Sequence, residues 1–155
     1  MGKAWDRRDR ISAISSITVS PKTRQLNLYF DLLPDNRNVR AEDIVAYLRR
    51  LQEHLGSRMT IVWDGSNVHD RSKLVRAYLA KHPGIVTERL PAYAPEMNPD
   101  ELVWAWTKYS RLGNLAAYST AWLRDYIVTE MAYLRRHPEM LASFIDHTDL
   151  NLLPK

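Results

Sequence analysis

The stretch "MTIVWDGSNVHD" (59–70) begins with a short apolar run, residues 59–63, which leads to the carboxylate of Asp64. Residues 59–63 lack the alternation of a half-exposed strand, and the run predicts a short strand buried on both faces. Asp64 follows directly, before Gly65. Two interpretations of Asp64 are open: a strand-end acid that hydrogen-bonds the turn at Gly65 and Ser66, or a functional acid at the edge of a parallel sheet.

The segments after this strand predict a parallel βαβ unit. A helix is expected over "DRSKLVRAYLAKHPG" (70–84), ended by its Pro-Gly pair, and a strand over "IVTERLP" (85–91). A helix between two neighbouring strands makes them parallel, with a right-handed crossover. The next helix is expected over 98–114, with Asn98 as its N-cap and Pro99 at its first position.

The remaining segments predict a hairpin and further helices. "RISAISSITVS" (10–20) and "QLNLYFDLL" (25–33) alternate apolar and polar residues, and the turn "PKTR" between them indicates an antiparallel hairpin. Residues 41–56 repeat leucine and isoleucine at helical spacing (Ile44, Leu48, Leu51 and Leu55), and helices are also expected over 119–137 and 138–146. We therefore expect one α/β domain over residues 1–155.

Composition excludes several classes of protein. The chain has 155 residues, 45% of them apolar, and no cysteine, so it is neither disordered nor built on disulfides or thiolate metal sites. No apolar stretch reaches the length that spans a bilayer, and a cytoplasmic protein is expected. The net charge is +4, and residues 1–50 hold ten Lys and Arg against six Asp and Glu. This excess fits either a solvated surface or attraction to a polyanion such as DNA.

A second acid is expected near Asp64. The strand at 85–91 leads through a loop into the helix that carries Glu101 in its first turn, so both acids can reach one edge of the sheet. Two such carboxylates repel unless a cation lies between them, and their hard oxygens suit Mg²⁺ or Mn²⁺. A pair of these ions can support phosphodiester cleavage or transfer. The alternative for Glu101 is a capping box with Asn98.

Together these segments resemble a known family. "TIVWDGSNVH" followed by "ERLPAYAPEMNPDELVWAWTK" looks like the DDE transposases of mariner-related bacterial insertion sequences. Thirty-six residues lie between Asp64 and Glu101, near the spacing typical of that group. The residues that carry the motif are Asp64, His69, Leu90, Pro91, Tyr93, Pro95, Asn98, Pro99, Glu101, Trp104 and Lys108.

The resemblance implies a ribonuclease H-like mixed sheet flanked by helices. It implies metal-dependent cleavage at transposon ends and joining to target DNA, with Asp64 and Glu101 as the second and third acids of a triad and metal ligands. His69 and Asn98 would support the site, and a complete enzyme would hold two Mg²⁺ or Mn²⁺ ions. Basic residues on the flanking helices are candidate phosphate contacts or, alternatively, ordinary surface charges: Lys73, Arg76, Lys108 and Arg111.

The sequence departs from the family at its start. The first acid of the triad, its central strand and a helix-turn-helix region are not found before Arg10, so we expect the C-terminal part of a transposase. Such a chain would be marginally stable, or pair residues 11–19 with 59–64, or borrow a strand from another copy. An upstream transposase fragment, an intact transposase or a second copy are the expected protein partners.

Three functions remain open. The first is a strand transferase that has little or no activity by itself, because two carboxylates hold the metal ions weakly. The second is a non-catalytic DNA-binding or oligomerising remnant. The third is another ribonuclease H-like nuclease, such as a resolvase.

Overall fold

The computed structural model describes residues 10–65, 72–109, 119–148 and 150. The chain divides into two compact units. The first combines the described parts of residues 1–37 and 99–155, and the second consists of the described parts of residues 38–98.

The first unit is built on an antiparallel hairpin. Strand β1 (Ala13–Val19) pairs with β2 (Leu26–Leu32), with Ala13 opposite Leu32 and Val19 opposite Leu26. The turn is closed by backbone hydrogen bonds between Ser20 and Gln25 (2.9 Å) and between Arg24 and Ser20 (2.8 Å). The hairpin predicted over 10–33 is confirmed.

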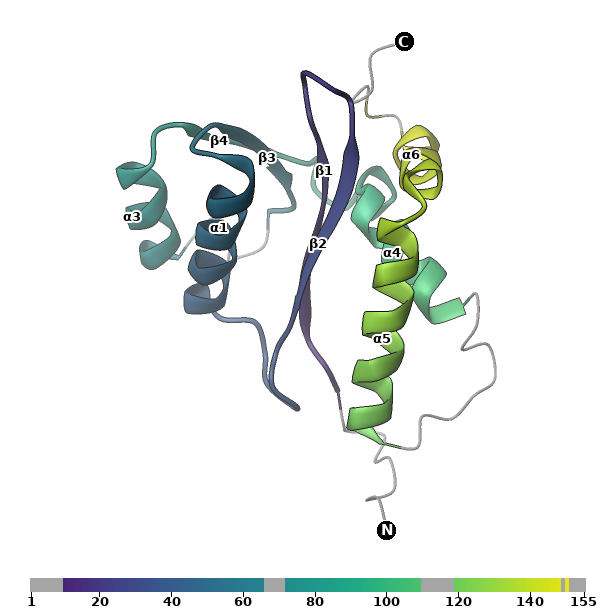
Figure 1. The fold of residues 1–155 in the computed structure, drawn as a ribbon. Coiled ribbons are helices and arrows are strands. Elements are labelled where there is room, and N and C mark those ends of the chain that lie inside the picture. The colour runs from purple at the N-terminus through teal and green to yellow at the C-terminus, as the bar shows by residue number, and fades with distance from the viewer. Residues whose placement is uncertain (1–9, 66–71, 110–118, 149, 151–155) are drawn as a thin grey trace. The chain divides into compact units, whose positions relative to one another are not determined.

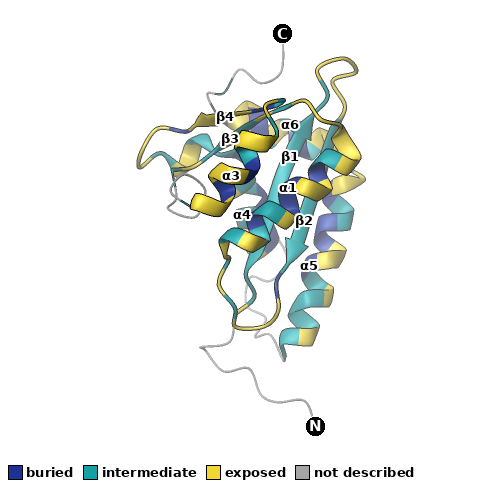
Figure 2. Ribbon diagram, turned by 90° about the vertical axis from the view of Figure 1, so that its left-hand side faces the viewer, coloured by how far each residue is buried: buried dark blue, intermediate teal, exposed yellow. Residues whose placement is uncertain are grey.

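Three helices complete this unit (Figure 1): α4 (Pro99–Tyr109), α5 (Thr120–Arg135) and α6 (Pro138–His147). Helix α4 contacts β1, whereas α5 and α6 contact β2. In Figure 2 the buried residues of α5 form bands that alternate with exposed ones, as an amphipathic helix requires. The core consists of Leu28, Val103, Ile127, Met131, Leu134 and Leu141.

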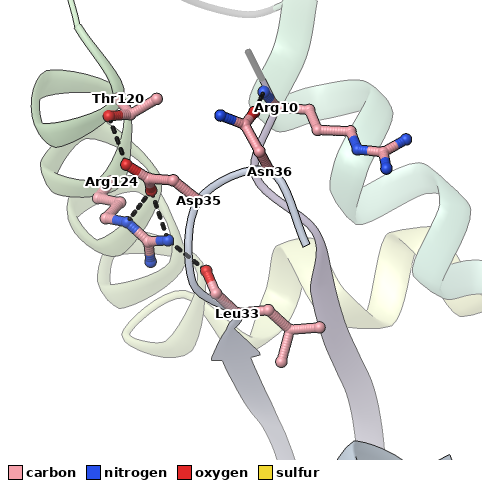
Figure 3. Close-up of polar contacts among 6 residues, drawn as sticks. All are labelled: Arg10, Leu33, Asp35, Asn36, Thr120 and Arg124. Carbon is pink, nitrogen blue, oxygen red and sulfur yellow. Dashed lines mark hydrogen bonds and ion pairs between the residues drawn. The ribbon is translucent and has the colours of Figure 1, made fainter. Parts of the chain in front are cut away.

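A polar cluster ties the loop after β2 to the start of α5 (Figure 3). The Asp35 carboxylate accepts hydrogen bonds from the Thr120 hydroxyl (2.7 Å) and from Arg124 Nε (2.9 Å). The Arg124 guanidinium also donates to the Leu33 carbonyl. The hydrogen bond from Thr120, followed by that from Arg124, lowers the pKa of Asp35 below its ordinary value. Loop and helix are thereby joined although they lie far apart in the sequence.

The second unit contains the predicted βαβ arrangement. Helix α1 (Ala41–Leu55) precedes β3 (Met59–Trp63), and α3 (Lys73–Lys81) connects it to β4 (Ile85–Arg89). The two strands are parallel, with Met59 opposite Ile85 and Trp63 opposite Arg89. A 3-10 turn, η1 (Pro95–Met97), follows.

Two details of the helices in this unit differ from expectation. Helix α3 ends at Lys81 rather than at residue 84, because Pro83 has no N–H to continue the helix. In α1 the buried face is Ile44, Tyr47, Leu48 and Leu51. Leu55, expected on that face, is 41% exposed because it is the last residue of the helix.

The expectation that the strand at 59–64 is buried on both faces is wrong. Thr60 and Val62 are exposed, whereas Met59, Ile61 and Trp63 are half-buried. This alternation is that of a strand with only one covered face. An apolar run of five residues cannot by itself distinguish one covered face from two.

The predicted α/β class is confirmed as a mixed architecture with an antiparallel hairpin, a parallel pair and helices. Within the described residues the strands form two separate two-stranded sheets, β1–β2 and β3–β4. Pairing of residues 11–19 with 59–64 stays a prediction, because these strands belong to different units. Among the helices that the structure describes, none has the length and apolar character needed to cross a membrane.

Candidate functional site

Asp64 lies at the carboxyl edge of the parallel pair. The strand ladder continues one step beyond β3 and β4, because the Leu90 amide donates to the Trp63 carbonyl at 2.8 Å. Asp64 follows Trp63 and is exposed to solvent. Its predicted position at a strand end is therefore confirmed, and this edge is where α/β proteins place their chemistry.

Sequence reasoning missed an arginine at the same edge. The Arg89 guanidinium donates to the carbonyl of Gly65 over 3.4 Å. A Cβ atom built on Gly65 would lie only 2.0 Å from a guanidinium nitrogen of Arg89, so the missing side chain is what admits the arginine. A glycine after a strand-end acid, with an arginine at the end of the next strand, is the signal that points to this contact.

Glu101 lies in the first turn of α4, in the first unit, and is exposed. Helix α4 begins at Pro99, as predicted. Asn98, immediately before it, is half-buried, and its backbone N–H donates to the Pro95 carbonyl at 3.0 Å. Glu101 therefore presents a carboxylate at the start of a helix, where a negative charge is favoured.

A second feature that sequence reasoning missed holds this helix start in place. The Ser15 hydroxyl on β1 donates to Asp100 Oδ2 at 2.6 Å and accepts from Trp104 Nε1 at 2.8 Å. Asp100 and Trp104 are four residues apart and share one face of α4, whereas Glu101 lies about 100° further around the helix. The spacing of Asp100 and Trp104 was visible in the sequence, but their partner on a distant strand was not.

Burial raises the pKa of Asp100 above its ordinary value. Desolvation, followed by repulsion from the charge of Glu101, raises the pKa of Asp100, whereas the hydrogen bonds from Ser15 and Trp104 lower it. The resulting pKa is about 6, compared with an ordinary value of 3.8. Asp100 therefore loses its proton less readily than an ordinary aspartate, beside Glu101, which stays exposed to solvent.

The residues predicted to contact DNA lie on different elements of the fold. Lys73 and Arg76 are exposed on the first turns of α3, the helix between β3 and β4. Lys108 is exposed in the last turn of α4. His69 and Arg111 lie outside the described residues.

The two candidate metal ligands belong to different units, Asp64 to the second and Glu101 to the first. Both are exposed carboxylates, and hard oxygen donors of this kind fit Mg²⁺ or Mn²⁺. Over the part of the chain that the structure describes, no three acidic, histidine or cysteine side chains gather into a metal-binding group. The donor chemistry fits a divalent cation, but the described residues do not bring three ligands together.

Comparison with known proteins places this chain in a family. Residues 3–121 match the DDE superfamily endonuclease family, and the chain belongs to it. The catalytic domain of Mos1 transposase, solved with raltegravir and magnesium, is similar in structure at 18% sequence identity and a TM-score of 0.48. That match covers 88% of this chain and 81% of the Mos1 chain. No curated protein shows significant similarity to the chain.

Proposed function

We propose that this chain carries the second and third acids of a DDE transposase related to bacterial mariner-like insertion sequences. The observation that carries the proposal is the family match, because residues 3–121 include both Asp64 and Glu101. Their exposure supports it, since a carboxylate must be accessible to hold a cation that also contacts DNA. The meeting of the two acids at one site is part of the proposal.

The proposed reaction is cleavage of DNA at transposon ends and transfer of the end to target DNA. Asp64 and Glu101 would hold Mg²⁺ or Mn²⁺ through their carboxylate oxygens. When bound, a pair of such ions activates the attacking oxygen and stabilises the leaving one. The chain's own cations, Lys73, Arg76 and Lys108, would bind DNA phosphates and hold the backbone against the acids. Arg111 would be a further phosphate contact, and His69 and Asn98 would have the supporting roles that the motif implies.

A third carboxylate is needed to fix both ions, and we expect it from outside residues 1–155. An upstream transposase fragment, an intact transposase or a second copy of this chain would supply it. Such an assembly would act on DNA in the bacterial cytoplasm, at the nucleoid. Cleavage by this chain alone is therefore expected to be weak or absent.

The test compares Mn²⁺-dependent nicking of end-sequence DNA by the chain with and without the upstream fragment. We expect nicking only in the mixture, and we expect Asp64→Asn or Glu101→Gln to abolish it. Glu139 is a matched control, because it is an exposed acid in the first turn of α6, which also begins at a proline. Nicking by the mixture that survives Asp64→Asn would overturn the catalytic assignment.

One observation favours a second function. A DNA-binding remnant that joins intact transposase without cutting needs exposed cations rather than a complete triad, and Lys73, Arg76 and Lys108 are exposed. DNA binding by the chain, together with an unchanged absence of nicking after the upstream fragment is added, would support the remnant over the strand transferase.

A further inference from the structure

Arg89 and Gly65 form a contact that the motif residues do not explain. Arg89 is the last residue of β4 and pairs in register with Trp63, so its side chain starts at the same edge as Asp64. The guanidinium crosses to the neighbouring strand end and donates to the Gly65 carbonyl. A charged side chain thereby lies beside the residue that follows the candidate catalytic acid.

The contact depends on the absence of a side chain at residue 65. Three guanidinium atoms of Arg89 would lie within 2.0–2.4 Å of a Cβ atom at Gly65. Real Cβ contacts are essentially never that short, so a larger residue at position 65 would make the flexible guanidinium shift to another position. Arg89 nevertheless remains exposed to solvent, and its charge is accessible to a large anion.

We propose that Arg89 binds a DNA backbone phosphate at the carboxyl edge of β3–β4 and that the lack of a side chain at Gly65 leaves room for its guanidinium there. This inference rests on the proposed function and adds a specific contact to it. A phosphate that approaches Asp64 meets a like charge, and a guanidinium at the same edge offsets that repulsion. Arginine suits the task because its planar group can donate two parallel hydrogen bonds to one phosphate.

The chain offers a matched control at the other end of the same sheet. Arg58 is exposed immediately before β3, at the amino edge of the parallel pair. It lies beside Gly84, as Arg89 lies beside Gly65, because a Cβ atom on Gly84 would be 3.6 Å from Arg58 Cγ. Loss of Arg58 therefore removes the same charge from the same unit, far from Asp64 along the strand.

The first measurement is the salt dependence of binding to a short fluorescent DNA duplex, made with EDTA so that no metal contributes. Arg89→Ala is expected to weaken binding roughly tenfold at low salt and to reduce the slope of log K against log salt by about one. Arg58→Ala is expected to leave that slope nearly unchanged. Equal effects of the two variants would overturn the proposal, because they would show a response to net charge alone.

The second measurement uses Gly65→Ala alone and combined with Arg89→Ala. If the glycine acts by admitting Arg89, Gly65→Ala weakens binding several-fold by itself and has no effect once Arg89 is alanine. Additive losses would show that Gly65 acts independently, which contradicts the proposal. Arg89→Lys keeps the charge but loses the planar group, so its affinity should fall between wild type and Arg89→Ala. Circular dichroism verifies that each variant is folded.

The binding data and the nicking data separate the two proposals. If wild type binds DNA but Arg89→Ala behaves as Arg58→Ala does, the Arg89 contact is wrong and the transposase function is untouched. If Arg89→Ala lowers the salt slope but the mixture with the upstream fragment never nicks DNA, the contact stands and the catalytic function is wrong. A wild-type chain that does not bind DNA by itself overturns the Arg89 contact, whereas the nicking assay of the mixture still decides the catalytic function.

Discussion

Ser15 and Asp100 are joined by a 2.6 Å hydrogen bond that connects β1 to the first turn of α4. The same hydroxyl accepts from Trp104 Nε1, so one small side chain holds two positions on the helix. Glu101 follows Asp100 directly, in the helix turn that this hydrogen bond joins to a strand residue 85 positions earlier in the chain.

The first prediction concerns this hydroxyl. Ser15→Ala should destabilise the chain by about 1–3 kcal/mol, because Asp100 and the Trp104 indole both lose a hydrogen-bond partner in a partly buried place. Urea denaturation measures the effect. Trp104→Phe removes the indole donor together with part of the ring that packs against the core, and the two substitutions should be non-additive. Strict additivity would mean that Ser15 and Trp104 do not share one network.

The second prediction concerns pH and Asp100. Its folded pKa of about 6 lies above the unfolded value of 3.8, so the folded state binds a proton more tightly. The contribution of Asp100 to the free energy of unfolding is present in full below pH 4 and is lost as pH rises through 6. Without metal, Asp100→Asn should thus be more stable than wild type at neutral pH, by on the order of 2–3 kcal/mol, and the difference should disappear near pH 4. A wild-type advantage that grows with pH would contradict this.

The third prediction has the opposite sign. The pKa of Asp35 is lowered in the folded chain, so its contribution is present above the unfolded pKa and is lost as pH falls through the folded one. Asp35→Asn should lower the melting temperature at neutral pH, and the difference in melting temperature between wild type and variant, the gap, should become small at acidic pH. Added salt should narrow it as well, because Asp35 is exposed and salt screens its pairing with Arg124. A gap that is independent of both pH and salt would refute the role of the charge.

The fourth prediction compares two glycines. A Cβ atom on Gly84 would lie 2.3 Å from the Ser57 carbonyl oxygen, which is backbone and cannot swing away. Gly56 has open space around it but a φ of +93°. Gly56→Ala should cost about 1–3 kcal/mol, because a φ of 93° with a ψ of −178° is a backbone conformation found almost only at glycine. Gly84→Ala should cost more because the turn before β4 must shift. Denaturation midpoints of the two variants rank the costs, and the reverse order would show that the turn yields easily.

Much of the local structure followed from the sequence. Alternation at 10–33 predicted the hairpin, and the succession of helix and short strands at 41–91 predicted the parallel pair. These predictions succeeded because strand and helix periods, turns and proline stops are properties of neighbouring residues. The extent to which β3 is covered was predicted wrongly, because it depends on what packs over the strand and not on the strand itself.

At the candidate site, too, the sequence predicted the local positions of residues but not their long-range contacts. The motif alone located Asp64 at a strand end and Glu101 at a helix start, because turn and cap residues mark such positions directly. Only tertiary structure revealed the contacts of Ser15 with Asp100 and of Arg89 with Gly65, since their members lie far apart in the chain and meet only after folding. Local patterns determine which elements form and where they end, whereas the packing of distant elements decides which charged groups face one another.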